Sequence, residues 1–227
     1  MAGMHTIQML GLFGAASYLA ARLARASGRA AFNRYAIIAQ PRTGLPDMPR
    51  GFRVEELGGH ALARHEVDAD ADVQAQRFAE GLTCLGVFDP KERLTGLIWL
   101  REGAYREDEV AVRFVLPPLC CWDTGLWIAP EYRMGRSFAA LWTGVGHWMD
   151  ARGLSHSLSR VSDYNRTALN AHQRMGAAVL AHHSIVRLGG WQWCRTARPR
   201  LVRLVSGREA VLSLAPLRDQ SASVSAS

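Results

Sequence analysis

Residues 126–136 are Leu126-Trp127-Ile128-Ala129-Pro130-Glu131-Tyr132-Arg133-Met134-Gly135-Arg136, and the fold is decided around them. An apolar segment ends at a proline and continues through a basic loop, which predicts a strand that turns into a helix. The first turn of a helix has free backbone N–H groups and a partial positive charge, so it favours an anion. The stretch therefore predicts a site for a phosphate-bearing ligand.

Strand and helix patterns surround this stretch. We expect strands at 35–39, 52–57, 82–88, 94–100, 109–115, 120–129, 157–161 and 178–188. We expect helices at 58–81, 137–152 and 165–175, and a Pro- and Gly-rich linker at 40–50. Antiparallel strands followed by alternating strand and helix predict an α+β fold.

The chain has 227 residues, enough for one domain with extensions at both ends. Its four cysteines form neither a CxxC pair nor a Cys/His zinc spacing, which predicts buried thiols in a reducing compartment and no metal site. His182 and His183 are adjacent on a predicted strand and point to opposite faces, so they are a poor metal pair. These features indicate a cytoplasmic protein.

The net charge of +7 is concentrated in the flanks. Residues 1–50 carry six arginines and one acid, and residues 196–227 carry five arginines and two acids. Such flanks suit an acidic surface, although a simply solvated surface explains them equally well. Nucleic-acid binding is disfavoured, because the central part has no positive excess and no interleaving of basic and aromatic residues.

The segment from residue 4 to residue 21 holds no formal charge and precedes Arg22, Arg25 and Arg29. Its spacing predicts a helix over residues 6–33. The apolar part is short for a membrane span and lacks the basic start of a secretory signal. Residues 4–33 therefore dock on the domain or on a second subunit, lie on a membrane surface, or form a marginal span, and the first two alternatives are favoured over spanning. Binding to a membrane surface would place the protein at the inner face of that membrane.

A second motif follows the basic loop after about thirty residues. Residues 165–177 are Asn165-Arg166-Thr167-Ala168-Leu169-Asn170-Ala171-His172-Gln173-Arg174-Met175-Gly176-Ala177. Together the two motifs resemble those of the GNAT superfamily, whose members are acyl-CoA-dependent N-acyltransferases. The resemblance covers roughly residues 52–195. It implies a mixed, mostly antiparallel central sheet flanked by helices, here with an N-terminal helical extension.

The resemblance also implies where acetyl-CoA or another acyl-CoA would bind. In the family, the strand before the loop pairs with the pantetheine arm, and the loop and helix start hold the pyrophosphate. The residues implied for the arm are Trp127, Ile128 and Ala129, with a further contact from Asn165. Those implied for the pyrophosphate are Arg133, Met134, Gly135, Arg136 and Ser137.

The loop departs from the family pattern [QR]-x-x-G-x-[GA]. Aligned on Arg133, the two small positions hold Arg136 and Phe138, while Gly135 comes one position early. Either the loop geometry is shifted or CoA binds less tightly. A non-catalytic, membrane-associated adaptor that retains the fold is the alternative.

Two side chains are candidates for catalysis. His172 stands where the family commonly has a tyrosine that protonates the departing sulfur, and an imidazolium with a pKa near 6.5 can do the same. Asp123 lies on the predicted strand that leads to Ile128, among apolar neighbours. Such neighbours raise the pKa of a carboxyl, which suits a base. Glu109, Glu131 and His147 are weaker candidates. A water can also act as the base.

We therefore predict an N-acyltransferase that moves an acetyl or other acyl group directly to an amine. We expect an N-terminal extension at 1–50, the acyltransferase domain at 51–195, and a basic segment with a disordered Ser/Ala tail at 196–227. The acceptor is a small molecule or a cell-envelope amine. Tryptophans 122, 127, 191 and 193 are expected near its cleft. The last strand of such proteins often pairs across subunits, so a homodimer is a further expectation.

Overall fold

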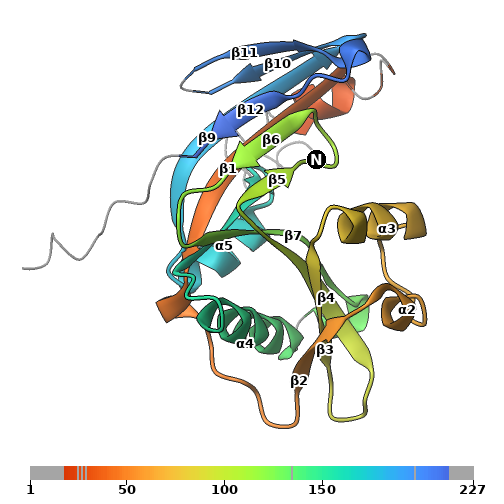
Figure 1. The fold of residues 1–227 in the computed structure, drawn as a ribbon, viewed down its shortest axis with the longest axis vertical. Helices are drawn as coiled ribbons and strands as arrows, with labels where there is room; N and C mark the ends of the chain where they lie inside the picture. Colours follow the sequence, from red (N-terminus) through yellow and green to blue (C-terminus); the bar gives the residue numbers. More distant parts are fainter. Residues whose placement is uncertain are drawn as a thin grey trace, which may run out of the picture.

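A computed structural model of the chain describes residues 18–24, 26, 28, 30–133, 135–196 and 198–214. In these residues the fold is α+β, with one large mixed sheet in the order β11-β10-β9-β1-β8-β7-β4-β3-β2 and a small sheet in the order β12-β6-β5 (Figure 1). The large sheet comprises β1 (Ala30–Pro41), β2 (Arg53–Leu57), β3 (Thr83–Phe88), β4 (Leu94–Glu102), β7 (Cys120–Ile128), β8 (His156–Ser162), β9 (Ala178–Leu188), β10 (Trp191–Arg195) and β11 (Arg200–Arg203). The small sheet comprises β5 (Ala104–Arg106), β6 (Val112–Val115) and β12 (Ala210–Ser213).

The helices are α2 (Gly59–Leu62), α3 (Ala71–Ala79), α4 (Ser137–Asp150) and α5 (Arg166–Arg174), with 3-10 turns η1 (Arg42–Gly44), η2 (Pro130–Tyr132) and η3 (Leu204–Ser206). Residues 18–24 are also helical. The predicted helix at 58–81 is wrong as one element, because α2 and α3 are separated by a loop. Asp70 has extended dihedral angles at the start of α3, as an N-cap residue does.

The N-terminal strand β1 lies in the middle of the large sheet. It pairs antiparallel with β8 and with β9, through pairs such as Ala39–Leu158 and Ala30–Leu188. Its residues 35–40 are buried because both faces of the sheet are covered there. The predicted strand at 35–39 is thus confirmed and extended to twelve residues. Residues 30–41, which the sequence assigns to the extension and linker, belong to the sheet.

Two apolar layers hold the large sheet. On one face Trp99 and Trp122 pack with the small sheet and α3, and the Trp122 ring stacks between those of Tyr105 and Phe114 at 5.3 and 4.6 Å. On the other face α4 packs through buried residues such as Trp142. The central strands are therefore covered on both sides, which explains their nearly continuous apolar sequences.

The chain ends differ from expectation where the structure describes them. β10, β11 and β12 follow the predicted last strand, and β12 pairs parallel with β6. The basic segment beyond residue 196 thus contributes to both sheets. Predictions for residues 4–17 and for the Ser/Ala tail lie outside the described residues. No helix in the described part of the chain is long and apolar enough to cross a membrane.

Candidate functional site

The strands β7 and β8 lie parallel but pair only at their beginnings. Their register joins Cys120, Cys121 and Trp122 to residues 156–158. β7 continues to Ile128 and β8 to Ser162, and beyond Trp122 the described residues of these two strands form no further pair with each other. The backbone edges that face each other between the two strands are therefore available to an extended ligand, which can bind as an added strand.

The end of β7 leads through η2 to the start of a helix, where an anion is favoured. After η2 the chain reaches α4, whose N-terminal residue Ser137 is fully buried. Among the described atoms its Oγ has no hydrogen-bond partner. The N-cap residue Arg136 gives no side-chain cap, and the first backbone bond into the helix runs from Ala140 N–H to the Arg136 carbonyl. The earlier amides and the Ser137 hydroxyl are suited to phosphate oxygens.

The arginines of this loop adopt different positions. The Arg136 guanidinium lies over the Phe52 ring, 5.9 Å from its centroid, and its side chain is exposed. Arg133 folds back and donates from Nε to the Ile128 carbonyl at 3.3 Å. Gly135 is exposed and donates its N–H to the Tyr132 carbonyl at 2.9 Å. Met134 lies outside the described residues.

The three residues expected to hold the pantetheine arm close β7. Ile128 and Ala129 are buried, and Trp127 is half-buried. The Ala129 N–H already donates to the Thr95 carbonyl at 3.0 Å, and the Ile128 carbonyl accepts from Arg133. Their placement thus leaves fewer free backbone groups than the sequence suggests.

Asp123 lies just beyond the last β7–β8 pair, on the face that α4 covers. It is buried, and its Oδ2 accepts a hydrogen bond from the Ser157 hydroxyl at 2.6 Å. Burial raises the pKa of Asp123 to about 7, and the Ser157 hydrogen bond only partly offsets this. A carboxyl with such a pKa is half ionised near neutral pH, where a general base is most effective.

His172 is buried between α5 and α4, edge-on to the Trp142 ring at 5.2 Å between centroids. Burial lowers its pKa to about 4. The imidazolium expected from the sequence is therefore scarce at neutral pH. A neutral ring can donate a hydrogen bond to a departing sulfur, but it is too weak an acid to protonate it. Asn165 is the N-cap of α5, where its side chain accepts from Ala168 N–H at 3.2 Å.

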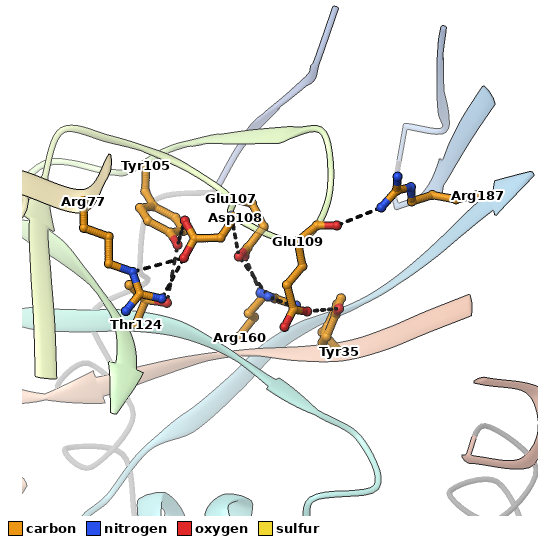
Figure 2. Close-up of polar contacts among 9 residues, drawn as sticks. All are labelled: Tyr35, Arg77, Tyr105, Glu107, Asp108, Glu109, Thr124, Arg160 and Arg187. Carbon is orange, nitrogen blue, oxygen red and sulfur yellow. Dashed lines mark hydrogen bonds and ion pairs between the residues drawn. The ribbon is translucent and has the colours of Figure 1, made fainter. Parts of the chain in front are cut away.

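On the opposite face of the sheet, three consecutive acids lie over the two parting strands (Figure 2). They are Glu107, Asp108 and Glu109, in the loop between β5 and β6, and we call them the acidic loop. Asp108 accepts from Arg77 of α3 at 2.7 Å and from the Tyr105 hydroxyl at 3.3 Å. The same hydroxyl lies 3.4 Å from the Thr124 hydroxyl of β7.

The other two acids reach β8. Arg160 of β8 forms ion pairs with both Glu107 and Glu109, and it donates to them at 2.9 and 3.0 Å. Glu109 also accepts from the Tyr35 hydroxyl at 3.3 Å, and Arg187 donates to its carbonyl (Figure 2). The acidic loop therefore bridges both strands at the point where they part.

Burial raises the pKa of Glu107, although Arg160 opposes the shift. The sequence does not reveal this cluster. From the sequence Glu109 alone is a candidate, and a weak one. The cluster is not visible there because its partners on β1, β8 and β9 are distant along the chain. Three successive acids at 107–109 were the available signal.

The remaining sequence candidates lie elsewhere. Glu131 and His147 are exposed, the first in η2 and the second on α4. The Cys121 thiol is buried and its pKa is raised to about 12, which disfavours a covalent role. Trp122 is fully buried, whereas Trp191 and Trp193 are exposed on β10, a strand several positions from β7 in the sheet.

Comparisons with known proteins give structural likeness alone. No family model matches the sequence, and no curated protein matches it. A conserved protein of unknown function from Staphylococcus epidermidis aligns with a TM-score of 0.50 and 11% identity, over 74% of this chain and 66% of its own. A GCN5-related N-acetyltransferase from Sphaerobacter thermophilus aligns with a TM-score of 0.46 and 15% identity, over 74% and 56%.

An aminoglycoside 6'-N-acetyltransferase from Acinetobacter baumannii aligns with a TM-score of 0.41 and 15% identity, over 56% of this chain and 90% of its own. In the first three structures found, the chain covers 55%, 66% and 64% of their lengths. At these identities the likeness concerns the fold.

Proposed function

We propose that this chain, whose fold is GNAT-like, is an acyl-CoA-dependent N-acyltransferase that transfers an acyl group directly to an amine. The observation that carries the proposal is the parting of β7 and β8 beyond Trp122, directly before the α4 N-terminus. The open strand edges suit the amide-containing arm of CoA, and the helix start suits its pyrophosphate.

The reaction needs modest help from the protein. The amine nitrogen forms a bond to the thioester carbonyl carbon, the C–S bond breaks, and a proton passes overall from nitrogen to sulfur. Asp123 is the proposed acceptor of that proton through water, because it is buried on the face opposite the acidic loop and its pKa of about 7 matches the task. His172, whose ring stays neutral, is proposed to donate a hydrogen bond that stabilises the departing thiolate, and the thiolate takes its proton from water.

The acceptor is proposed to approach from the face of the acidic loop. An amine arrives as a cation, and Glu109, which shares Arg160 with Glu107, is the exposed carboxylate of the acidic loop that can attract it. The Glu109 side chain is 66% exposed, so it can meet the acceptor, whereas Glu107 is enclosed with Arg160. This arrangement favours small cationic amines over neutral acceptors.

Calorimetric titration of the full chain with acetyl-CoA, and then with longer acyl-CoAs, tests the proposal. We expect binding that weakens at least about tenfold in the double variant Arg133→Ala/Arg136→Ala, because charge-assisted bonds to phosphate are lost. Arg152→Ala, just beyond the opposite end of α4, is the matched control and should bind as the parent does. Absence of binding by every acyl-CoA to the folded protein would contradict the proposal.

The second candidate is an adaptor that keeps the fold without catalysis. It is favoured by Arg136 at a position where the family has a small residue, and by Arg133 occupying the Ile128 carbonyl. The same titration separates the two functions, since an adaptor need not bind acyl-CoA.

A further inference from the structure

One face of the sheet end formed by β9, β10 and β11 is apolar and exposed. Cross-strand pairs place Leu188 beside Trp191, Val186 beside Trp193, and Trp193 beside Leu201, so these side chains share a face. We call these five residues the tryptophan face. Their exposed fractions lie between 36% and 65%.

The opposite face of the same strands is packed. Gln192 and Cys194 alternate with the two tryptophans and are buried, and Gln192 bonds both backbone groups of Ala111 at 2.9 Å. Strand alternation normally gives the solvent-facing side to polar residues. Here that side carries large apolar residues, which is typical of a surface that binds something.

The stretches of sequence that form and adjoin the tryptophan face have an excess of positive charge. Residues 164–208 contain eight arginines and no aspartate or glutamate, and residues 1–46 contain five arginines and no acid. The described parts of these two stretches adjoin, because β1 pairs with β9. Arg203 lies over the Trp191 ring at 5.8 Å, and Arg195 is exposed beside Trp193 on the same strand.

The acids bordering this region are already engaged. Asp163 forms an ion pair with Arg34 at 3.3 Å, and Glu209 forms one with Arg113. Asp163 therefore neutralises Arg34, one of the arginines counted above, whereas the partner of Glu209 is not among them, so the two stretches keep an excess of positive charge.

We propose that the tryptophan face docks on an anionic lipid bilayer surface. Tryptophan is favoured at the membrane interface, leucine and valine reach the apolar boundary, and the surrounding arginines pair with lipid phosphates. A second copy of this chain is a poor occupant, because it would bring an equally positive surface into contact.

The helical residues 18–24 extend the same surface. Leu19 and Leu23 lie one helical turn apart and are exposed, and Tyr18 contacts the Tyr164 ring at 5.8 Å. Figure 1 shows this short helix at the end of the molecule where β10 and β11 lie.

Vesicle flotation of the full chain tests the inference. We expect the protein to float with vesicles of phosphatidylcholine mixed with phosphatidylglycerol, weakly with phosphatidylcholine alone, and less at high salt. Trp191→Ser/Trp193→Ser should lower partition at least about tenfold, because two half-exposed indoles no longer insert. Leu119→Ser removes an exposed leucine just before β7, outside the tryptophan face, and should change nothing.

Tryptophan fluorescence gives an independent readout, since the other five tryptophans are buried or half-buried. A blue shift on anionic vesicles that disappears in the double variant supports the docking. Unchanged flotation of the folded double variant would overturn it and assign binding to the N-terminal segment. A parent chain that does not float with vesicles would also overturn the proposal. If the double variant then loses a dimer or loses oligonucleotide binding, the tryptophan face binds that partner instead.

Discussion

The buried position of Asp123 lowers the stability of the folded protein when the Asp123 carboxyl is ionised. Its pKa is about 7 in the folded protein, against an ordinary value of 3.8, so the folded state holds the proton more tightly than the unfolded state does. The contribution of protonated Asp123 to folding stability is fully present below pH 4 and is lost as pH rises through 7. A buried carboxyl with such a shift is a candidate for function, because packing alone would favour a neutral residue.

The variant Asp123→Asn tests both the effect of Asp123 on stability and its proposed role as the base. The variant cannot ionise, so at pH 8 it should be more stable than the parent by up to about 4 kcal/mol, with the difference vanishing near pH 4. If Asp123 is the base, turnover should fall by about 10²–10⁴. Urea denaturation over a pH series and steady-state kinetics measure the two effects. A stability gain with unchanged turnover would remove Asp123 from the mechanism.

The matched control is Asp150→Asn. The Arg42 guanidinium holds the pKa of the exposed Asp150 carboxyl below its usual value, so the shift has the opposite sign. That contribution to stability is present at neutral pH and is lost on acidification. Asp150→Asn should therefore be slightly less stable than the parent at pH 8, never more stable.

At the scale of elements, the acidic loop depends on β8. Arg160→Ala would leave Glu107 buried without its cation, and we expect a loss of about 3–5 kcal/mol at pH 8. The defect should shrink toward pH 5, because a Glu107 without Arg160 can be protonated. Urea denaturation measures both. Arg53→Ala, which breaks an exposed pair with Glu92, should have only a slight effect. An equally small effect of Arg160→Ala would contradict the prediction.

Local sequence patterns predicted the long elements, whose apolar periodicity is visible within the element itself. β9 was expected at 178–188 and has those bounds, and α4 and α5 differ from expectation by one or two residues at either end. The patterns failed where pairing is distant: β12 has four residues, and it forms a strand because β6 lies beside it. For the same reason the sequence placed Asp123 on its strand but could not assemble the acidic loop with Arg160.

At the scale of the whole molecule, β1 joins two parts of the large sheet that share no other strand pairing in the described residues. It lies between β8 and β9, and Ile37 of β1 pairs with Arg160 on one side and Ala181 on the other. β9, β10 and β11 therefore reach the rest of the large sheet only through a segment from the N-terminal end of the chain. Substitutions in β1 should weaken the whole domain rather than one edge.

Ile37→Ala tests this. Ile37 is fully buried, and its truncation should cost about 2–5 kcal/mol while unfolding stays a single transition. Leu23→Ala, at an exposed position of the preceding helix, should change stability by less than about 0.5 kcal/mol. Urea denaturation followed by circular dichroism and by tryptophan fluorescence measures both, because coincident curves indicate one cooperative unit. Separate transitions in the parent would mean that β9–β11 and the remaining sheet unfold independently. In that case β1 would connect the two parts without making them one cooperative unit.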